Sequence, residues 1–324
     1  MMLKGIVGKE QVKGGTILQK MLVSFTLILI GYILGAYSFS HQTWPINVII
    51  ANRNDTIAQN LSRNFNEFGA FSNLAKKREV LCPAQDTSTA VVLVLGQSNS
   101  ANHAEKKFST QYPTKVLNYY LGKCYSAESP LLGASGVEGE YLTLLGDLLI
   151  KEGNLSNVVL INKSIGGTTV SDWSGQGRFS SDLVTKLNAL NFKYRVTHTI
   201  WHQGESDFTS NTSFKEYRES FQELQLTLNR TSVTAPIFIV ISTICGFNST
   251  WTAQNPVATA QKSLIDNRDI FLGIDADATL LTSDRRAQSP SQEPNCHLSE
   301  KGQVKVAKSI SNKILNIRNF ETRN

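Results

Sequence analysis

Four short segments of the sequence contain the residue types that an acyl transfer requires. They are Gly96–Asn99 (GQSN), Gly166–Thr168 (GGT), Trp201–Asp207 (WHQGESD) and His297–Ser299 (HLS). A serine hydroxyl becomes a nucleophile when an adjacent base removes its proton. Ser98 can be that nucleophile, and His297 can take its proton and later return it to a leaving alcohol. The competing interpretations are a helix N-cap for Ser98 and a capping or surface position for His297.

The tetrahedral intermediate of an acyl transfer places negative charge on the former carbonyl oxygen, and that charge needs hydrogen-bond donors. The backbone N–H groups of Ser98 and Gly167 and the side-chain amide of Gln203 can supply them. The loss of one such donor commonly lowers the rate by about 100- to 1000-fold. We therefore predict an oxyanion hole made of Ser98, Gly167 and Gln203.

Three further residues lie in or near these segments and are candidates for contact with the substrate. Asn99 follows the serine, His202 precedes Gln203, and Trp173 lies shortly after the two glycines. An exposed tryptophan ring can stack on a sugar ring, whereas packing is the competing interpretation for both Trp173 and His202. His103 is also close enough in sequence to line the pocket.

The elements that must position these residues alternate along the chain. Continuous apolar runs predict strands buried on both faces, over 90–95, 158–162, 196–202, 236–243 and 270–275. Helical patterns lie between or after them, over 139–151, 180–190, 213–229, 253–265 and 299–317. This alternation predicts an α/β domain with a parallel sheet and helices on both faces. Ligands of such sheets bind at the carboxyl ends of the strands, where the four segments meet.

The four segments, in this order and spacing, resemble the SGNH hydrolase superfamily over about residues 88–315. Within it the chain is similar to the branch of sialate O-acetylesterases and acetylxylan esterases, in which the third segment reads Gln-Gly-Glu. The resemblance implies a flavodoxin-like three-layer α/β/α fold with a five-stranded parallel sheet. It also implies removal of acetyl groups from carbohydrate without a metal or another cofactor. Carried over, Ser98 is the nucleophile, Gly167 and Gln203 complete the oxyanion hole, and His297 is the base.

One departure from the family pattern concerns the acid that orients the histidine. The family usually has an aspartate three residues before the histidine, and here that position is Pro294. Glu205 and Glu293 are the two candidates for this role, and Asp275 and Asp277 are less favoured. A dyad in which a backbone carbonyl holds the imidazole is a further alternative.

The N-terminal part of the chain predicts a membrane anchor. Residues 21–39 contain no charged side chain, and about 20 apolar residues cross a bilayer as a helix. Lysines at positions 4, 9, 13 and 20 place the preceding end in the cytoplasm. We expect a tail over 1–20, an anchor over 21–39, a stem over 40–80 and the esterase domain over 81–324, in the periplasm, the secretory lumen or outside the cell. Cleavage of a signal peptide, with secretion, is the alternative.

The cysteines and the charge support a catalytic domain outside the cytoplasm. The four cysteines form no metal-binding pattern, and of three connectivities we favour Cys82–Cys124 and Cys245–Cys296. Seven N-x-S/T sequons permit glycosylation; they begin at Asn54, Asn60, Asn154, Asn162, Asn211, Asn229 and Asn248. The net charge of +6 owes much to the N-terminal lysines, and no basic block indicates nucleic-acid binding.

The sequence therefore predicts a serine esterase that removes O-acetyl groups from carbohydrate through an acyl-Ser98 intermediate. Two alternatives stay open. The same serine and histidine could hand the acetyl group to a glycan acceptor, as in a membrane-anchored O-acetyltransferase. Because Pro294 replaces the usual acid, an inactive module that binds glycans is the other alternative.

Overall fold

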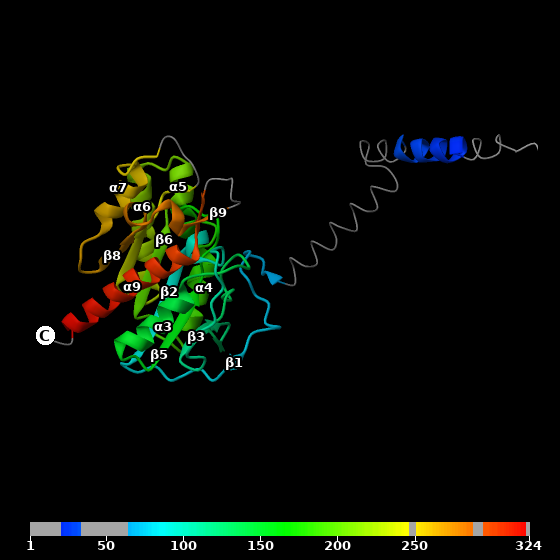
Figure 1. The fold of residues 1–324 in the computed structure, drawn as a ribbon. Coiled ribbons are helices and arrows are strands. Elements are labelled where there is room, and N and C mark those ends of the chain that lie inside the picture. Colours follow the sequence, from blue (N-terminus) through cyan, green and yellow to red (C-terminus); the bar gives the residue numbers. More distant parts are fainter. Residues whose placement is uncertain (1–20, 34–63, 246–250, 288–293, 322–324) are drawn as a thin grey trace, which may run out of the picture. The chain divides into compact units, whose positions relative to one another are not determined.

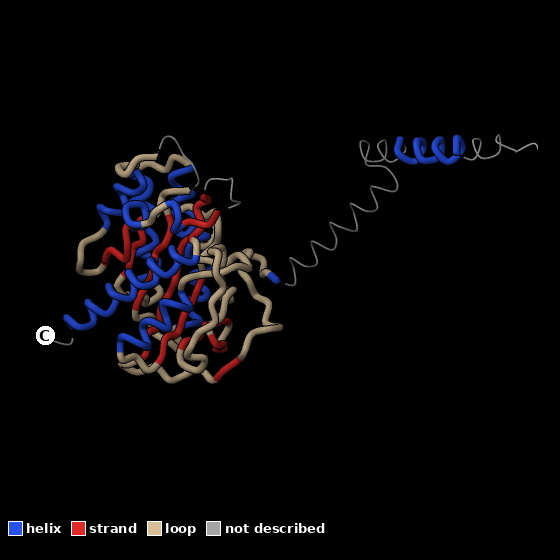
Figure 2. The backbone as a smooth tube through the Cα atoms, viewed as in Figure 1, coloured by secondary structure: helices blue, strands red, loops and turns tan. Residues whose placement is uncertain are grey.

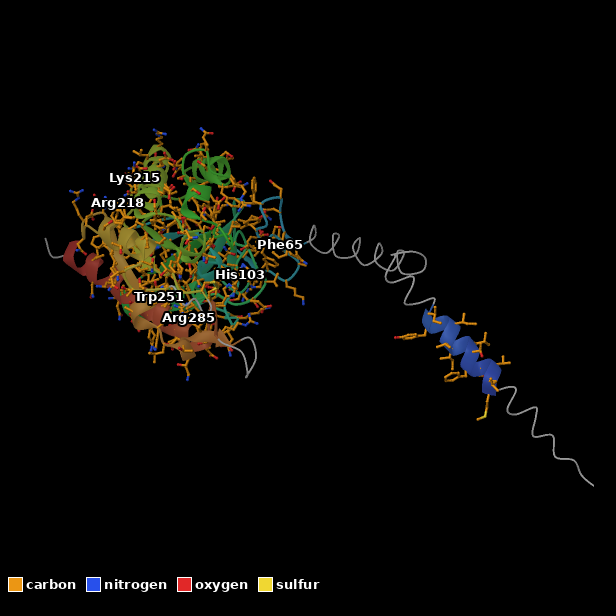
Figure 3. All side chains as sticks on the ribbon, turned by 90° about the horizontal axis from the view of Figure 1, so that it is seen from above. Phe65, His103, Lys215, Arg218, Trp251 and Arg285 are labelled. Atoms are coloured by element: carbon orange, nitrogen blue, oxygen red, sulfur yellow. A yellow bond between two sulfur atoms is a disulfide. The ribbon has the colours of Figure 1, made fainter. Side chains whose placement is uncertain are left out.

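The computed structural model describes residues 21–33, 64–245, 251–287 and 294–321 (Figure 1). The chain divides into two units, Met1–Ser62 and Arg63–Asn324. In the first unit, residues 21–33 form a helix with exposed apolar side chains (Figure 3). Within the described ranges, no helix is both long enough and apolar enough to span a bilayer. Residues 34–39 of the predicted anchor lie outside those ranges.

The second unit is built on a mixed sheet of eight strands in the described residues, in the order β1-β4-β3-β5-β2-β6-β7-β8. Neighbouring strands from β3 to β8 in this order are parallel, and β4 and β1 add antiparallel pairs at one edge. The strands are β1 (Glu79–Val80), β2 (Thr89–Gly96), β3 (Val116–Tyr120), β4 (Lys123–Ser126), β5 (Asn157–Asn162), β6 (His198–Gln203), β7 (Ile237–Ile241) and β8 (Ile270–Asp275). A separate hairpin pairs β9 (Arg285–Ala287) with β10 (Pro294–Leu298).

Helices cover both faces of the sheet, which gives three layers (Figure 2). Alternate residues of β2 point to opposite faces, so Val91 and Leu93 enter one core cluster and Val92 and Val94 enter the other. The first cluster also contains α4 (Ser180–Leu190), α6 (Phe214–Arg230) and α7 (Pro256–Leu264). The second contains α3 (Leu142–Gly153) and α9 (Glu300–Glu321). Short helices lie at strand ends or in loops: η1 (Ser98–Ser100), η2 (Val170–Trp173), α5 (Glu205–Thr209), α8 (Ala276–Thr279) and η3 (Thr282–Asp284).

The α/β class and the five strands and five helices expected from the sequence are confirmed. The expected number of strands was too small, because β1, β3 and β4 were not recognised. The sequence of β3 is VLNYY and that of β4 is KCYS, so neither is a continuous apolar run. Asn118 is nevertheless buried in β3, where its side chain donates to and accepts from the backbone of Leu132. Polar side chains that pair with loops thus concealed these strands.

The second unit, Arg63–Asn324, includes described residues that lie before the expected boundary at residue 81. Residues 64–80 were expected to belong to the stem. Instead, Ala70 and Phe71 are buried in the described structure. The Phe71 N–H donates to the Ala134 carbonyl at 2.8 Å, and the Gly133 N–H donates to the Phe71 carbonyl at 2.9 Å. These contacts join the segment around Phe71 to the rest of the second unit.

Both expected disulfides, Cys82–Cys124 and Cys245–Cys296, are confirmed. The first joins the segment before β2 to the buried strand β4. The second joins the segment after β7 to the residue before His297. Disulfides persist in oxidising compartments, so they indicate an extracellular or lumenal domain.

Candidate active site

The carboxyl end of β2 turns sharply into the segment that contains Ser98. Gly96 has φ +138°, and a Cβ atom at this position would overlap the carbonyl oxygen of His202 on the neighbouring strand β6. Only glycine combines this conformation with so close an approach. Ser98 then begins η1 at the edge of the sheet and keeps 7% of its surface exposed.

Asn99 connects the Ser98 segment to both neighbours of His297. Its side-chain Nδ2 donates to the Cys296 carbonyl at 2.8 Å, and its Oδ1 accepts from the Leu298 N–H at 3.1 Å. The same Nδ2 donates to Glu205 Oε1 at 2.7 Å. Because Asn99 is directly bonded to Ser98, these hydrogen bonds bring the segments of the candidate nucleophile and base together.

Asn99 is fully buried, so the substrate contact expected for it is corrected to a positioning contact.

His297 is half-buried and lies against a second imidazole, that of His103. The ring centroids are 5.4 Å apart and the rings are inclined by 23°. Burial lowers the pKa of His297 to about 4, with smaller contributions from His103 and Arg286. The imidazole is therefore neutral at neutral pH, which is the form that accepts a proton.

The Gly166-Gly167 loop after β5 lies beside the His103 ring. The Gly166 N–H donates to Ser135 Oγ at 2.7 Å, and Ser135 Oγ is 3.1 Å from His103 Nε2. Gly167 has φ +74° and faces open space. In the described part of the chain, neither the Ser98 N–H nor the Gly167 N–H donates to a protein acceptor. Both backbone donors are thus available to an oxyanion.

Gln203 is not available in the same way. Its Nε2 donates to the Thr168 carbonyl at 3.1 Å and also to Asp207 Oδ2, which engages both hydrogens. Its Oε1 accepts from Tyr217 Oη at 3.0 Å. The arrangement therefore argues against the oxyanion role expected for this side chain. Gln203 instead holds the loop that carries Gly167.

Trp173 and His202 also differ from expectation, because both are buried. Trp173 is 1% exposed, stacks on Phe179 and donates from Nε1 to Thr168 Oγ1 at 3.1 Å. His202 is 0% exposed, and its Nδ1 lies 3.3 Å from Tyr141 Oη. Neither ring has a face for a sugar, so their substrate-binding roles are corrected to packing roles.

Of the two acids expected to orient the histidine, only Glu205 lies within the described residues. Glu205 is buried, and its Oε1 accepts from Asn99 at 2.7 Å and from Ser242 at 2.8 Å. Burial raises the pKa of Glu205 to about 7. Through Asn99, this carboxyl supports the backbone on both sides of His297. Glu293 lies outside the described residues.

Arg285 is a residue that the sequence did not identify. It is 7% exposed, and its Nη1 donates to the Cys296 carbonyl at 3.2 Å, next to His297. Its position relative to His103 can be followed in Figure 3. No local pattern marks it, because it lies in an ordinary Asp-Arg-Arg sequence at the start of β9. Only the pairing of β9 with β10 brings it to the site.

Comparisons with known proteins address the family. A family model described as carbohydrate esterase, sialic acid-specific acetylesterase, matches residues 88–316. No curated protein matches the chain.

Three of the solved structures that match the chain have the following similarities. A protein from Arabidopsis thaliana has a TM-score of 0.51 and 16% identity, over 71% of this chain and 98% of that chain. NanS has a TM-score of 0.49 and 15% identity, over 73% of this chain and 98% of that chain. Axe2, an acetylxylan esterase from Geobacillus stearothermophilus, has a TM-score of 0.43 and 15% identity, over 69% of this chain and 94% of that chain. The Arabidopsis structure supports a shared fold. Because the family model covers most of the 324 residues, the chain belongs to the carbohydrate esterases described as sialic acid-specific acetylesterases, and it is a carboxylic ester hydrolase.

Proposed function

We propose that the chain removes O-acetyl groups from carbohydrate hydroxyls through an acetyl-Ser98 intermediate, with His297 as general base. The observation that carries this proposal is the hydrogen bonding of Asn99 to Cys296 and Leu298, which ties the Ser98 segment to the backbone around His297. Membership in the carbohydrate esterase family supports the substrate class.

The reaction proceeds in two steps. His297 takes the proton from Ser98 Oγ, which attacks the acetyl carbonyl and forms a tetrahedral intermediate. The N–H groups of Ser98 and Gly167 stabilise its negative oxygen. His297 gives the proton to the departing sugar oxygen, which leaves Ser98 acetylated. Water then attacks the acetyl group with the same base, and acetate departs.

Glu205 has a supporting role in this mechanism. Its carboxyl accepts from Asn99, whose amide also binds the Cys296 carbonyl. Glu205 thus acts on the backbone before His297 through one intermediate side chain.

The test of this function is acetate release by the full chain, purified oxidised in mild detergent. The substrates are a panel of O-acetylated glycans that includes acetylated sialic acid and acetylated xylan. We expect stoichiometric acetate and deacetylated sugar from at least one glycan. Addition of unacetylated acceptor glycans separates hydrolysis from transfer, because a transferase would form a new acetylated acceptor in place of acetate. If neither acetate nor deacetylated sugar forms from any glycan of the panel, the proposal is overturned.

We also propose that residues 21–39 anchor the chain in a membrane with the esterase unit on the non-cytoplasmic side. The uncharged sequence and the preceding lysines support this topology. Of the sequons in the described ranges, Asn154, Asn211 and Asn229 are exposed and Asn162 is buried, so among these four the first three can carry glycans on the folded unit. When the full chain is expressed in cells and the membranes are isolated, the chain should stay with the membranes after a wash at alkaline pH. Complete release into the supernatant at full length would contradict the anchor, and release of a shortened chain would indicate signal cleavage.

A further inference from the structure

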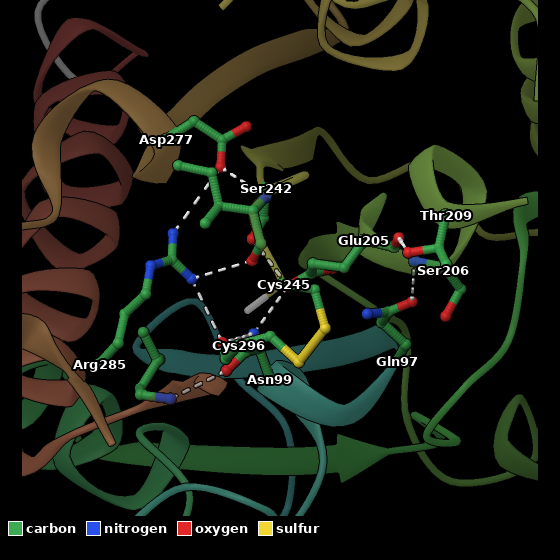
Figure 4. The surroundings of a disulfide bond; sticks show 12 residues. Gln97, Asn99, Glu205, Ser206, Thr209, Ser242, Cys245, Asp277, Arg285 and Cys296 are labelled. Carbon is green, nitrogen blue, oxygen red and sulfur yellow. Dashed lines mark hydrogen bonds and ion pairs between the residues drawn. A yellow bond between two sulfur atoms is a disulfide. The ribbon is translucent and has the colours of Figure 1, made fainter. Parts of the chain in front are cut away.

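The residue before His297 is fastened to the segment that follows β7 by two different bonds. Cys296 forms a disulfide with Cys245. In addition, Arg285 Nη1 donates to the Ile244 carbonyl at 3.1 Å and to the Cys296 carbonyl at 3.2 Å (Figure 4). One covalent bond and one shared donor therefore hold the same two backbone segments side by side.

Arg285 is itself held in place by a buried carboxylate. Its side chain and that of Asp277 are each 5% exposed, and Nη2 lies 3.8 Å from Asp277 Oδ1. The Asp277 carboxylate also accepts from the N–H groups of Thr243 and Ile244, at 2.9 Å and 3.1 Å. Removal of one member of such a buried pair leaves the other uncompensated. Asp277 thus fixes both Arg285 and the segment to which Arg285 ties Cys296.

The residues on the other side of His297 are fixed as well. The Leu298 N–H donates to Asn99, and the Ser299 N–H donates to the Asp284 carbonyl at 2.9 Å. His297 therefore lies between two restrained neighbours. Cys296, the residue before it, is bonded to Cys245, Arg285 and Asn99. A displacement of about 1 Å at a catalytic group can lower the rate by about 100-fold.

We propose that the Cys245–Cys296 disulfide and Arg285 are positioning elements for catalysis, which fix the backbone of His297 where the usual aspartate is replaced by Pro294. The inference rests on the proposed function, in which His297 is the base. Neither element touches the reacting atoms. Their effect is on the rate of the chemical step and not on the affinity for the glycan.

The two disulfides differ in accessibility, which provides an internal control. Cys82 and Cys296 are both half-buried, but Cys245 is exposed whereas Cys124 is 1% exposed in the core. Thiolate attack requires access to a sulfur atom. Dithiothreitol should therefore reduce Cys245–Cys296 first, to two cysteine thiols, and become oxidised to its cyclic disulfide.

The experiment is a titration of the full chain with dithiothreitol under native conditions. Alkylation and mass spectrometry measure the fraction of each disulfide that is reduced, and acetate release measures kcat and KM. We expect kcat to fall about 10- to 100-fold as Cys245–Cys296 is reduced. We expect KM to stay within about twofold, because uniform binding of the substrate is unaffected. An unchanged kcat after complete reduction of Cys245–Cys296, with Cys82–Cys124 intact, would overturn the inference.

Variants test the same inference without a reductant. Cys245→Ala/Cys296→Ala should reproduce the fall in kcat, and Cys82→Ala/Cys124→Ala should keep kcat in the folded fraction. If the first double variant does not fold, the kcat values of Arg285→Met and Arg285→Lys test the positioning role instead. Lysine keeps the charge beside Asp277 and should retain more kcat than methionine, whereas equal kcat values at the wild-type level would contradict the role of Arg285.

The same assays separate this inference from the proposed function. If the wild-type chain releases acetate and Ser98→Ala does not, the proposed function holds whatever the cysteine variants do. If the wild-type chain releases none, the proposed function fails and the inference fails with it.

Discussion

Replacement of Ser98 by alanine is expected to lower kcat/KM for acetate release by at least about 1000-fold, or about 4 kcal/mol of transition-state stabilisation. Alanine removes the Oγ atom that forms the acyl intermediate but keeps the backbone N–H in the oxyanion hole. The substitution removes a single oxygen atom from a residue that keeps 7% of its surface exposed. The fold should therefore persist, and the loss should appear in kcat.

His297→Ala should cause a loss of similar size, because the serine hydroxyl then has no base. Residues that act as one catalytic unit are strongly non-additive. The Ser98→Ala/His297→Ala double variant should consequently be no slower than the slower single variant. Ser210→Ala, at an exposed position after α5, is the matched control and should retain full activity. Additive losses in the double variant would contradict a shared mechanism, and an active Ser98→Ala would eliminate this serine as nucleophile.

The sequence predicted the sheet well because its central strands are buried on both faces. The β2 sequence TAVVLVLG is buried at every position, so burial leaves a continuous apolar run that can be read directly. The same logic fails for β3, where Asn118 is buried through hydrogen bonds and not through apolarity. Strand recognition from hydrophobicity therefore weakens wherever a polar side chain is satisfied by a loop distant in sequence.

The candidate site was predictable in its location but not in the roles of its individual side chains. Parallel strands bring their carboxyl ends to one edge, so Ser98 after β2 and Gly167 after β5 could be assigned to that edge from the order of elements alone. His297 lies on β10 of the separate hairpin and follows no strand of the parallel sheet. The role of Gln203 could not be predicted, because it depends on where its two amide hydrogens point. Those directions are set by Asp207 and by the Thr168 carbonyl, which is contributed by another loop.

The role of Asn99 also could not be predicted from the sequence, and it bears on the aspartate that Pro294 replaces. A polar residue next to a nucleophile is a reasonable candidate for substrate contact when only the sequence is known. Two of its partners, Cys296 and Leu298, lie almost two hundred residues away in the sequence, and no local sequence pattern predicts these contacts. Asn99 forms hydrogen bonds with both neighbours of His297, and Arg285 and a disulfide also hold Cys296. The backbone of His297 is therefore restrained by several groups and does not depend on one acidic side chain.

The pH profile is expected to show the second large effect. Burial, and then His103 and Arg286, lower the pKa of His297 to about 4. A general base works in its neutral form, so the acidic limb of kcat/KM reports its pKa in the free enzyme. An ordinary histidine with a pKa of about 6.5 would be only about 3% neutral at pH 5. A pKa of about 4 leaves His297 mostly neutral there, so the activity at pH 5 should exceed that expected for an ordinary histidine by about 30-fold.

The measurement is kcat/KM for acetate release between pH 3.5 and 8, with circular dichroism at each pH to confirm that the chain stays folded. His103→Gln and Arg286→Gln remove positive neighbours and should each move the acidic limb to higher pH. The limb should stay below pH 6.5 in both variants, because burial is the largest cause of the low pKa. A wild-type limb at pH 6.5 that neither variant moves would contradict this account of His297.

A limb near pH 7 would have a different origin, because burial raises the pKa of Glu205 to about 7. Glu205→Gln distinguishes the two groups. Glutamine keeps an oxygen that can accept from Asn99 and Ser242 but cannot ionise. If the limb near pH 7 disappears in Glu205→Gln, the charge of Glu205 is required for activity and acts on the Asn99–Cys296 contact. If the profile of Glu205→Gln matches the wild type down to pH 5, Glu205 supports His297 through hydrogen bonding alone, and the base itself sets the pH dependence.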